Sequence, residues 1–289
     1  MKAPAIVVLL LFTGATVWAA REVHVYGIAN FGGSGECGSS GMTHPVHADT
    51  AAAFAKWFND ARDDGKWDDV RTRNNKDARG RYFTNWSKAV GCLCAADDSR
   101  ANFGADEADV IYVHTHGNHS TSAPWFSSLS MGNSNDSCAA RTDANMFWDD
   151  DLDIAVIKAC QSGDYDVWAN GGYRQQFTNS GSGFRMWNAF HGDSSCGDHV
   201  TTYVSWYASS SFHDGVGENW LDAAYDVVPG KNNDDCPVSI VFGETRSKRI
   251  ALFENGGWRD RKSTGKKTGS TYFYFEGCNP PNGRKLPSD

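Results

Sequence analysis

Two short apolar runs limit most strongly how this chain can fold. Residues 108–113 lead to His114, and residues 152–157 lead to Lys158. Both runs are rich in β-branched residues and lack a polar and apolar alternation, which is typical of strands covered on both faces of a parallel sheet. The sequence therefore predicts an α/β fold with a mostly parallel sheet flanked by helices.

A reactive side chain follows each run. His116 lies just past the first predicted strand and Cys160 just past the second. In open α/β sheets, ligands bind beyond the carboxyl ends of the strands, so neighbouring strands would place His116 and Cys160 in one crevice. An imidazole beside a thiol is the arrangement that produces a thiolate nucleophile.

The two blocks around these residues resemble the cysteine peptidases of the caspase, legumain, clostripain and gingipain group. They match the legumain blocks nearly in register, and read Tyr112-Val113-His114-Thr115-His116-Gly117 and Lys158-Ala159-Cys160-Gln161-Ser162-Gly163. The resemblance implies a three-layer caspase-like fold for residues 21–235. It also implies a peptidase or transpeptidase without a cofactor, in which Cys160 attacks a peptide carbonyl and His116 protonates the leaving amine. The backbone N–H groups of Gly117 and Cys160 would form the oxyanion hole.

The same resemblance bears on substrate recognition. In the relatives that cleave after Arg, Lys or Asn, the residue two before the nucleophile is usually acidic or an amide and lines the substrate pocket, whereas here it is Lys158. We expect either a pocket for an acidic or carboxamide group, or a buried Lys158 paired with an acid. Ser162 is a second expected substrate contact. His44 and His47 stand near the position of a substrate-binding arginine of legumains, so that role does not carry over.

Two other functions remain open from the sequence. The run His114-Thr115-His116-Gly117-Asn118-His119 resembles the first zinc block of metallo-β-lactamase-type hydrolases, and His191 offers a later ligand. That family usually has an aspartate where Asn118 stands, and the N-terminal half lacks its run of alternating strands. A third hypothesis is that the chain is a non-catalytic secreted binding protein with a caspase-like fold and a disulfide-bonded Cys160. Its binding surface would use the tryptophans Trp125, Trp148, Trp168 and Trp187.

The first twenty residues predict the compartment. Lys2, an apolar run from Ile6 to Phe12 and small residues up to Ala20 have the layout of a signal peptide. We expect residues 1–20 to be removed and the protein to be secreted or lumenal in the secretory pathway. The apolar run is too short to span a bilayer, and the net charge of −8 argues against a nucleic-acid partner. The expected partner is therefore a protein or peptide substrate, with neither nucleic acid nor a membrane.

Eight cysteines lie after residue 20, and disulfides are the default expectation for cysteines in an oxidising compartment. If Cys160 is a free nucleophile, seven remain, so at least one more must be free or bonded to another chain. Sequons at Asn85, Asn118 and Asn135 predict glycosylated surface loops, provided that the source glycosylates.

The remaining patterns predict a first strand at 21–30, a helix at 49–62, two helical segments at 164–176 and 184–190, and a helix at 216–228. The C-terminal strands are expected at 238–243, 250–253 and 271–275. They would form a small antiparallel extension within residues 236–289 that completes or extends the same domain.

Overall fold

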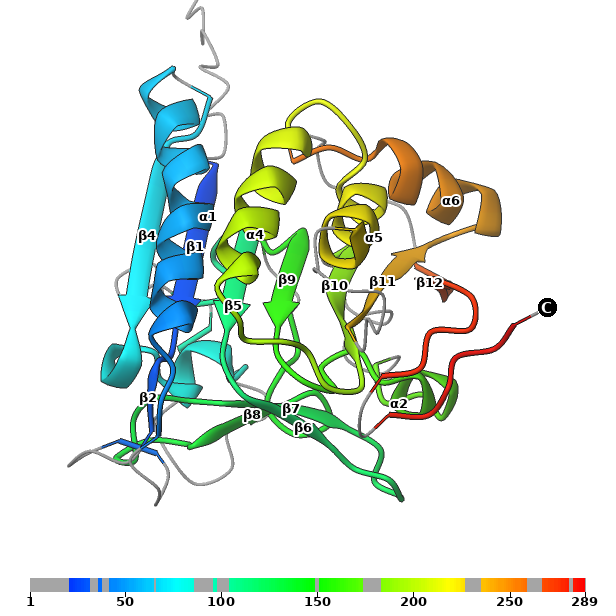
Figure 1. The fold of residues 1–289 in the computed structure, drawn as a ribbon, viewed down its shortest axis with the longest axis horizontal. Helices are drawn as coiled ribbons and strands as arrows, with labels where there is room; N and C mark the ends of the chain where they lie inside the picture. The colour runs from blue at the N-terminus through cyan, green and yellow to red at the C-terminus, as the bar shows by residue number, and fades with distance from the viewer. Residues whose placement is uncertain are drawn as a thin grey trace, which may run out of the picture.

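The computed structural model describes residues 21–31, 36–37, 42–64, 66–85, 96–97, 104–148, 151–173, 183–226, 235–258, 267–280 and 283–288. A mixed sheet of seven strands runs through the molecule (Figure 1). Its strands are β1 (Glu22–Gly27), β4 (Asp69–Asn74), β5 (Val110–His114), β9 (Ile154–Lys158), β10 (Met186–His191), β11 (Cys236–Gly243) and β12 (Gly269–Tyr274).

The strand order across the sheet is β12-β11-β10-β9-β5-β1-β4. Strands β4, β1, β5, β9 and β10 run parallel to one another, and β11 is antiparallel to both β10 and β12. The predicted α/β class and the mostly parallel sheet are confirmed. Every residue of the central strands β1, β5, β9 and β10 is buried, which explains the apolar runs of β5 and β9.

One face of the sheet is covered by helices that lie in front of it in Figure 1. They are α1 (Pro45–Asp63), α4 (His199–Ser210), α5 (Val216–Asp226) and α6 (Arg246–Asn255). The longest, α1, buries the apolar face that the sequence predicts, including Phe54 and Phe58. It begins four residues before the predicted start because Pro45 occupies its first turn, where a missing N–H costs nothing.

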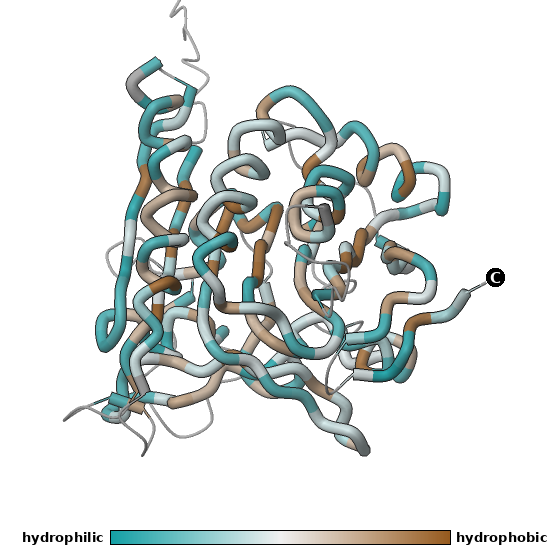
Figure 2. The backbone as a smooth tube through the Cα atoms, viewed as in Figure 1, coloured by the Kyte–Doolittle hydropathy of each residue, from teal (hydrophilic) through white to brown (hydrophobic). Residues whose placement is uncertain are grey.

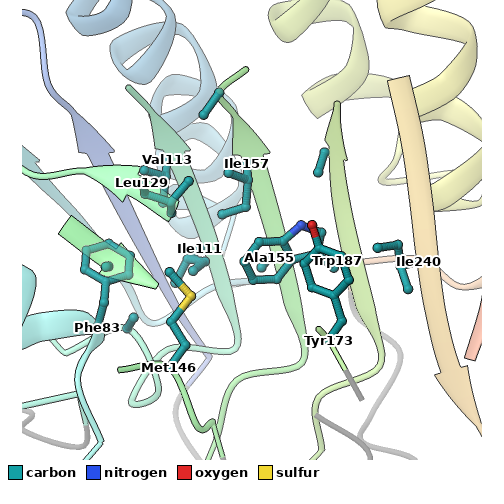
Figure 3. Close-up of a cluster of buried hydrophobic side chains, with 14 of the residues drawn as sticks. Phe83, Ile111, Val113, Leu129, Met146, Ala155, Ile157, Tyr173, Trp187 and Ile240 are labelled. Atoms are coloured by element: carbon teal, nitrogen blue, oxygen red, sulfur yellow. The ribbon is translucent and has the colours of Figure 1, made fainter. Parts of the chain in front are cut away.

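The opposite face of the sheet carries a second apolar core, shown in Figure 3. Successive strand residues divide between the two cores: Ile111 points into this one and Tyr112 into the helical one. The described side chains that cover this face include Phe83 of the 3-10 helix η2 (Gly80–Phe83), Leu129 and Met146. Figure 2 shows hydrophobic segments gathered in the central strands.

Short elements lie beyond the carboxyl ends of the parallel strands, in the lower part of Figure 1. A second sheet has three antiparallel strands, β6 (Gly117–His119), β7 (Ser127–Ser130) and β8 (Ala139–Arg141). The remaining elements are the pair β2 (Asn30–Phe31) and β3 (Met42–Thr43), the helix α2 (Tyr165–Ala169) and the 3-10 helix η1 (Asn75–Asp77). These elements surround the edge at which the candidate residues lie.

Several predicted elements are wrong in type. Residues 184–190, predicted to be helical, hold strand β10, because a short apolar run buried on both sides has no periodicity to separate strand from helix. Residues 250–253, predicted to be a strand, belong to helix α6. The predicted helix at 164–176 is reduced to α2 in the described residues, and β4 was not predicted. The C-terminal strands β11 and β12 extend the main sheet in the antiparallel sense, as the expected extension of the same domain requires.

Two disulfides, Cys37–Cys138 and Cys236–Cys278, tie loops to the body of the protein. They agree with an oxidising environment such as the secretory pathway. The predicted signal peptide, residues 1–20, lies outside the described residues. None of the described helices combines the length and the apolar character needed to cross a membrane.

Candidate active site

The predicted histidine and cysteine follow neighbouring strands. Strands β5 and β9 pair in parallel register with His114 opposite Lys158, and the Thr115 N–H donates to the Lys158 carbonyl at 3.2 Å. His116 and Cys160 each come two residues after this last pair. The register therefore carries both residues to the same carboxyl edge of the sheet, as the sequence predicts.

The two loops touch directly at Gly117. A Cβ atom on Gly117 would lie 1.9 Å from the Cys160 carbonyl oxygen and 3.1 Å from the Ala159 Cβ. Only a residue without a side chain permits this approach. The chain then turns sharply, because Gln161 adopts a φ of 55°, a left-handed conformation that non-glycine residues seldom adopt. The backbone after Cys160 is thus held in an uncommon conformation beside the first loop.

Cys160 is a free, partly exposed thiol. Its sulfur accepts a hydrogen bond from the Ser194 N–H at 3.4 Å and lies 3.8 Å from the Ser194 carbonyl oxygen. Four cysteines form the two disulfides, and Cys196 is the second free thiol of the described residues. This fits the expectation that, with Cys160 free, at least one more cysteine is free or bonded to another chain. Cys92 and Cys94 lie outside the described residues.

His116 packs among rings from the N-terminal part of the chain. Its ring centroid lies 4.7 Å from that of Phe31 and 4.8 Å from that of His44. Burial, followed by the charge of His44, lowers the pKa of His116, so the imidazole is neutral at neutral pH. Its Nε2 atom is buried and has no hydrogen-bond partner among the described residues. Within those residues no hydrogen bond joins His116 to Cys160.

A second thiol–imidazole contact joins two residues that the sequence does not mark as candidates for catalysis. The Cys196 sulfur lies 3.6 Å from His47 Nε2, and His47 Nδ1 donates to the Ile28 carbonyl at 2.7 Å. Burial, partly opposed by the bond to Ile28, lowers the pKa of His47 to about 3. Burial also raises the pKa of the Cys196 thiol, although the charge of Lys158 acts against it. Both partners are therefore uncharged at neutral pH.

The sequence contains only a weak indication that His47 and Cys196 lie together. His47 stands near the position of a substrate-binding arginine in the legumain resemblance, which marks the region but not the side chain's partner. Cys196 belongs to no recognisable motif, and 149 residues separate it from His47. Only the fold, which sets the loop after β10 against the start of α1, brings the two together.

Lys158 is completely buried, as one of the two expectations for it requires. Its ammonium donates to the Ser195 carbonyl and lies 4.5 Å from the centroid of the Phe190 ring. The other half of that expectation, an acidic partner, is not found: no ion pair to Lys158 occurs in the described segments. A side chain so enclosed does not reach a substrate directly.

Ser162 is also completely buried, which corrects its expected role as a substrate contact. Its hydroxyl donates to the Ala159 carbonyl at 2.7 Å and accepts from the Phe190 N–H at 3.3 Å. Its carbonyl accepts from the Trp187 indole at 3.0 Å. Ser162 therefore fixes the turn that carries Cys160.

The four histidines of the alternative zinc site do not form one group. His119 and His191 lie beside Asp164, with nitrogens 3.9 and 3.2 Å from Oδ2 of that carboxylate. Burial acts to raise the pKa of Asp164, but the hydrogen bond and charge of His191 outweigh it and hold this pKa below the usual 3.8. Among the described residues, three ligand atoms come within 4.8 Å of one another at His47, His114 and Cys196.

Two surface expectations are corrected in part. Trp148 and Trp187 are completely buried and stack at 5.5 Å between ring centroids, so they belong to the core and not to a binding surface. Asn85 is 4 % exposed, so its sequon does not present a surface asparagine. Asn118 and Asn135 are exposed, as predicted for glycan acceptors.

A scan against models of protein families finds no match, and a search of curated proteins finds no similar sequence. The geometry of the molecule is therefore the basis for any statement about its function.

Proposed function

We propose that this chain is a cysteine peptidase, or a transpeptidase, with Cys160 as the nucleophile and His116 as its acid–base partner. One observation carries the proposal: Cys160 is a free, partly exposed thiol at the end of β9, directly beside the strand that leads to His116. The resemblance of both blocks to the caspase and legumain group agrees with this placement. We also propose that the sheet and its helices form a three-layer caspase-like architecture.

The proposed reaction begins with transfer of the Cys160 thiol proton to the neutral imidazole of His116. The sulfur attacks the carbonyl carbon of a peptide bond, and backbone N–H groups of Gly117 and Cys160 stabilise the oxyanion. The C–N bond then breaks, and the imidazolium gives its proton to the leaving amine. Water attacks the resulting thioester and releases the acid, or a second amine attacks it and forms a new peptide bond.

The state of His116 suits this role. Its pKa is lowered by burial and then by His44, so at neutral pH it is in the base form needed to accept a proton. Its buried Nε2 has no partner among the described residues and so remains available. Catalytic hydrogen bonds in ligand-free enzymes are often long and tighten only when substrate binds, which accommodates the missing bond between His116 and Cys160.

The two alternatives have less support. In a zinc-dependent hydrolase, His114, His116, His119 and His191 would converge on one ion, but His119 and His191 lie against Asp164. In a non-catalytic binding protein, Cys160 would be tied in a disulfide, and it is free. The disulfides elsewhere agree with our proposal that the enzyme acts outside the cell or in the secretory lumen.

The test is cleavage of a mixed peptide library by the purified protein that begins at residue 21, with products identified by mass spectrometry. Cys160→Ala and His116→Ala should each abolish cleavage. Cys196→Ser is the matched control, because it removes the other free thiol near Ser194 and should leave cleavage intact. Iodoacetamide should also label Cys160 faster in the unmodified protein than in His116→Ala.

Two results would overturn the proposal. Cleavage that persists in Cys160→Ala would show that this thiol is not the nucleophile. Equal labelling rates at Cys160 with and without His116 would show that the imidazole does not activate it.

A further inference from the structure

Three side chains from distant parts of the chain meet near the carboxyl edge of the sheet. His47 comes from the first turn of α1, His114 ends β5, and Cys196 lies in the loop between β10 and α4. Two imidazole nitrogens and the Cys196 sulfur all lie within 4.8 Å of one another. The rings of His47 and His114 are 4.0 Å apart between centroids. From this geometry we infer that His47, His114 and Cys196 bind one Zn²⁺ ion.

Each ring has a hydrogen-bond partner on its Nδ1 atom. His47 Nδ1 donates to the Ile28 carbonyl, which can only accept, so the lone pair of His47 is on Nε2, the atom that faces Cys196. The Thr50 hydroxyl lies 2.9 Å from the Val46 carbonyl and 3.1 Å from the His47 carbonyl, and when it donates to either one it accepts from His114 Nδ1.

In that arrangement His114 Nε2 carries a lone pair as well. Histidines that bind metals almost always donate their other ring N–H to a carbonyl, a carboxylate or a water molecule, which fixes the tautomer. The Ile28 carbonyl serves this purpose for His47, and the Thr50 hydroxyl serves it for His114. The site therefore has supporting contacts that a chance cluster of side chains lacks.

The ligand types select the metal. Two imidazoles and a thiolate suit Zn²⁺, whereas Mg²⁺ and Ca²⁺ require oxygen ligands. Three protein ligands leave one position of a tetrahedral ion open. His47 and His114 are buried and Cys196 is partly exposed, so the thiol side is the more open side of the site.

The charges near the site act in both directions on a bound dication: the buried Lys158 ammonium, which acts on all three proposed ligands, opposes it, and the Asp235 carboxylate favours it. Zinc binding converts the Cys196 thiol to a thiolate and releases its proton. The buried ammonium of Lys158 then has an anion beside it. The Asp235 carboxylate, which accepts from both the N–H and the hydroxyl of Ser195, places a second negative charge next to Cys196.

The site is separate in its residues from the proposed peptidase pair. Cys160 and Cys196 both contact the Ser194 carbonyl, at 3.8 and 3.9 Å, but the three proposed ligands include neither Cys160 nor His116. The inference goes beyond the proposed function, and it stands or fails without any measurement of peptide cleavage.

The experiment titrates chelator-treated, disulfide-intact protein with Co²⁺, a spectroscopic substitute for Zn²⁺. We expect one equivalent to produce the charge-transfer absorption of a cobalt–thiolate bond, and Zn²⁺ to displace it. Cys196→Ser should remove this absorption, and Cys160→Ser, its matched control, should keep it. His47→Gln and His114→Gln should weaken binding by more than about 100-fold, beyond the 10–100-fold typical of losing a supporting contact.

X-ray absorption of the zinc-loaded unmodified protein keeps the test decisive if a variant fails to fold. We expect one sulfur at about 2.3 Å and nitrogen ligands at about 2.0 Å. The inference is overturned if no cobalt–thiolate absorption develops, if it survives in Cys196→Ser, if it disappears in Cys160→Ser, or if the zinc spectrum contains no sulfur ligand.

Discussion

Replacement of Gly117 by alanine tests whether the two loops of the proposed active site meet as described. The new Cβ would lie 1.9 Å from the Cys160 carbonyl oxygen. Ordinary van der Waals contact begins near 3.4 Å, so the loops must separate by about 1.5 Å. The obstacle is backbone, and the Cys160 segment is fixed by Ser162 and by the left-handed Gln161, so it cannot yield as a flexible side chain would.

Two quantities should change in Gly117→Ala. Overpacking of this kind costs about 1–3 kcal/mol, so the free energy of unfolding should fall by that amount in urea titrations followed by fluorescence. Displacement of a catalytic group by about 1 Å can cost about 100-fold in rate, so peptide cleavage should fall by a similar factor in the protein that remains folded.

Gly257→Ala is the matched control. A Cβ on Gly257 would meet nothing closer than the Ser211 carbonyl at 3.9 Å, so the substitution should leave stability within about 0.5 kcal/mol. If Gly117→Ala is as stable as the control, the close approach of Gly117 to Cys160 is wrong. If it is destabilised but cleaves peptides at the normal rate, the contact exists but does not position the nucleophile.

The remaining predictions concern parts of the fold that support the site. The double replacement of Cys236 and Cys278 by alanine opens a loop with a sequence separation of 42 and should lower the free energy of unfolding by about 4 kcal/mol in urea. Tyr272→Phe leaves the buried Gly163 carbonyl without the phenol that donates to it, and should cost about 1–3 kcal/mol; a negligible change would mean that water or another donor replaces the phenol. The pKa of Asp164 lies below its ordinary 3.8 in the folded protein, so its contribution to stability is complete above that pH and is lost as the pH falls below it. Unfolding curves of Asp164→Asn should therefore vary less with pH in the acid range than those of the unmodified protein, and parallel curves would contradict this.

The sequence predicted the secondary structure best where the pattern of apolar residues fits only one kind of element. The central strands β5 and β9 carry unbroken apolar runs, and only burial on both faces accounts for them. Strand β10 was mistaken for a helix because its buried run is too short to show a period, and α6 was mistaken for a strand because it has no buried residue to reveal its face. Strand β4 alternates charged residues at the sheet edge and gave no hydrophobic signal.

The candidate site was predictable only along two strands. His116 and Cys160 follow recognisable runs, so their position at one edge could be inferred from the sequence. His47 and Cys196 meet because a helix start and a loop fold onto that edge, and no local pattern encodes such a long-range contact. The burial of Ser162 was missed for the same reason, since its partner Phe190 comes from a strand that was itself misassigned.

The strand order has a consequence for how the chain is assembled. Strand β4 joins one side of β1 and β5 joins the other, and from β5 to β12 each strand of the main sheet pairs with the main-sheet strand formed before it. No strand has to enter between two that are already paired, so a chain that emerges from its N-terminus can extend the sheet one edge at a time. The first edge to be completed, β4, carries Asp69, Arg71 and Arg73, charges of the kind that discourage pairing with another chain. The other edge lies on the side of the last strand formed, and β12 is the final strand added there.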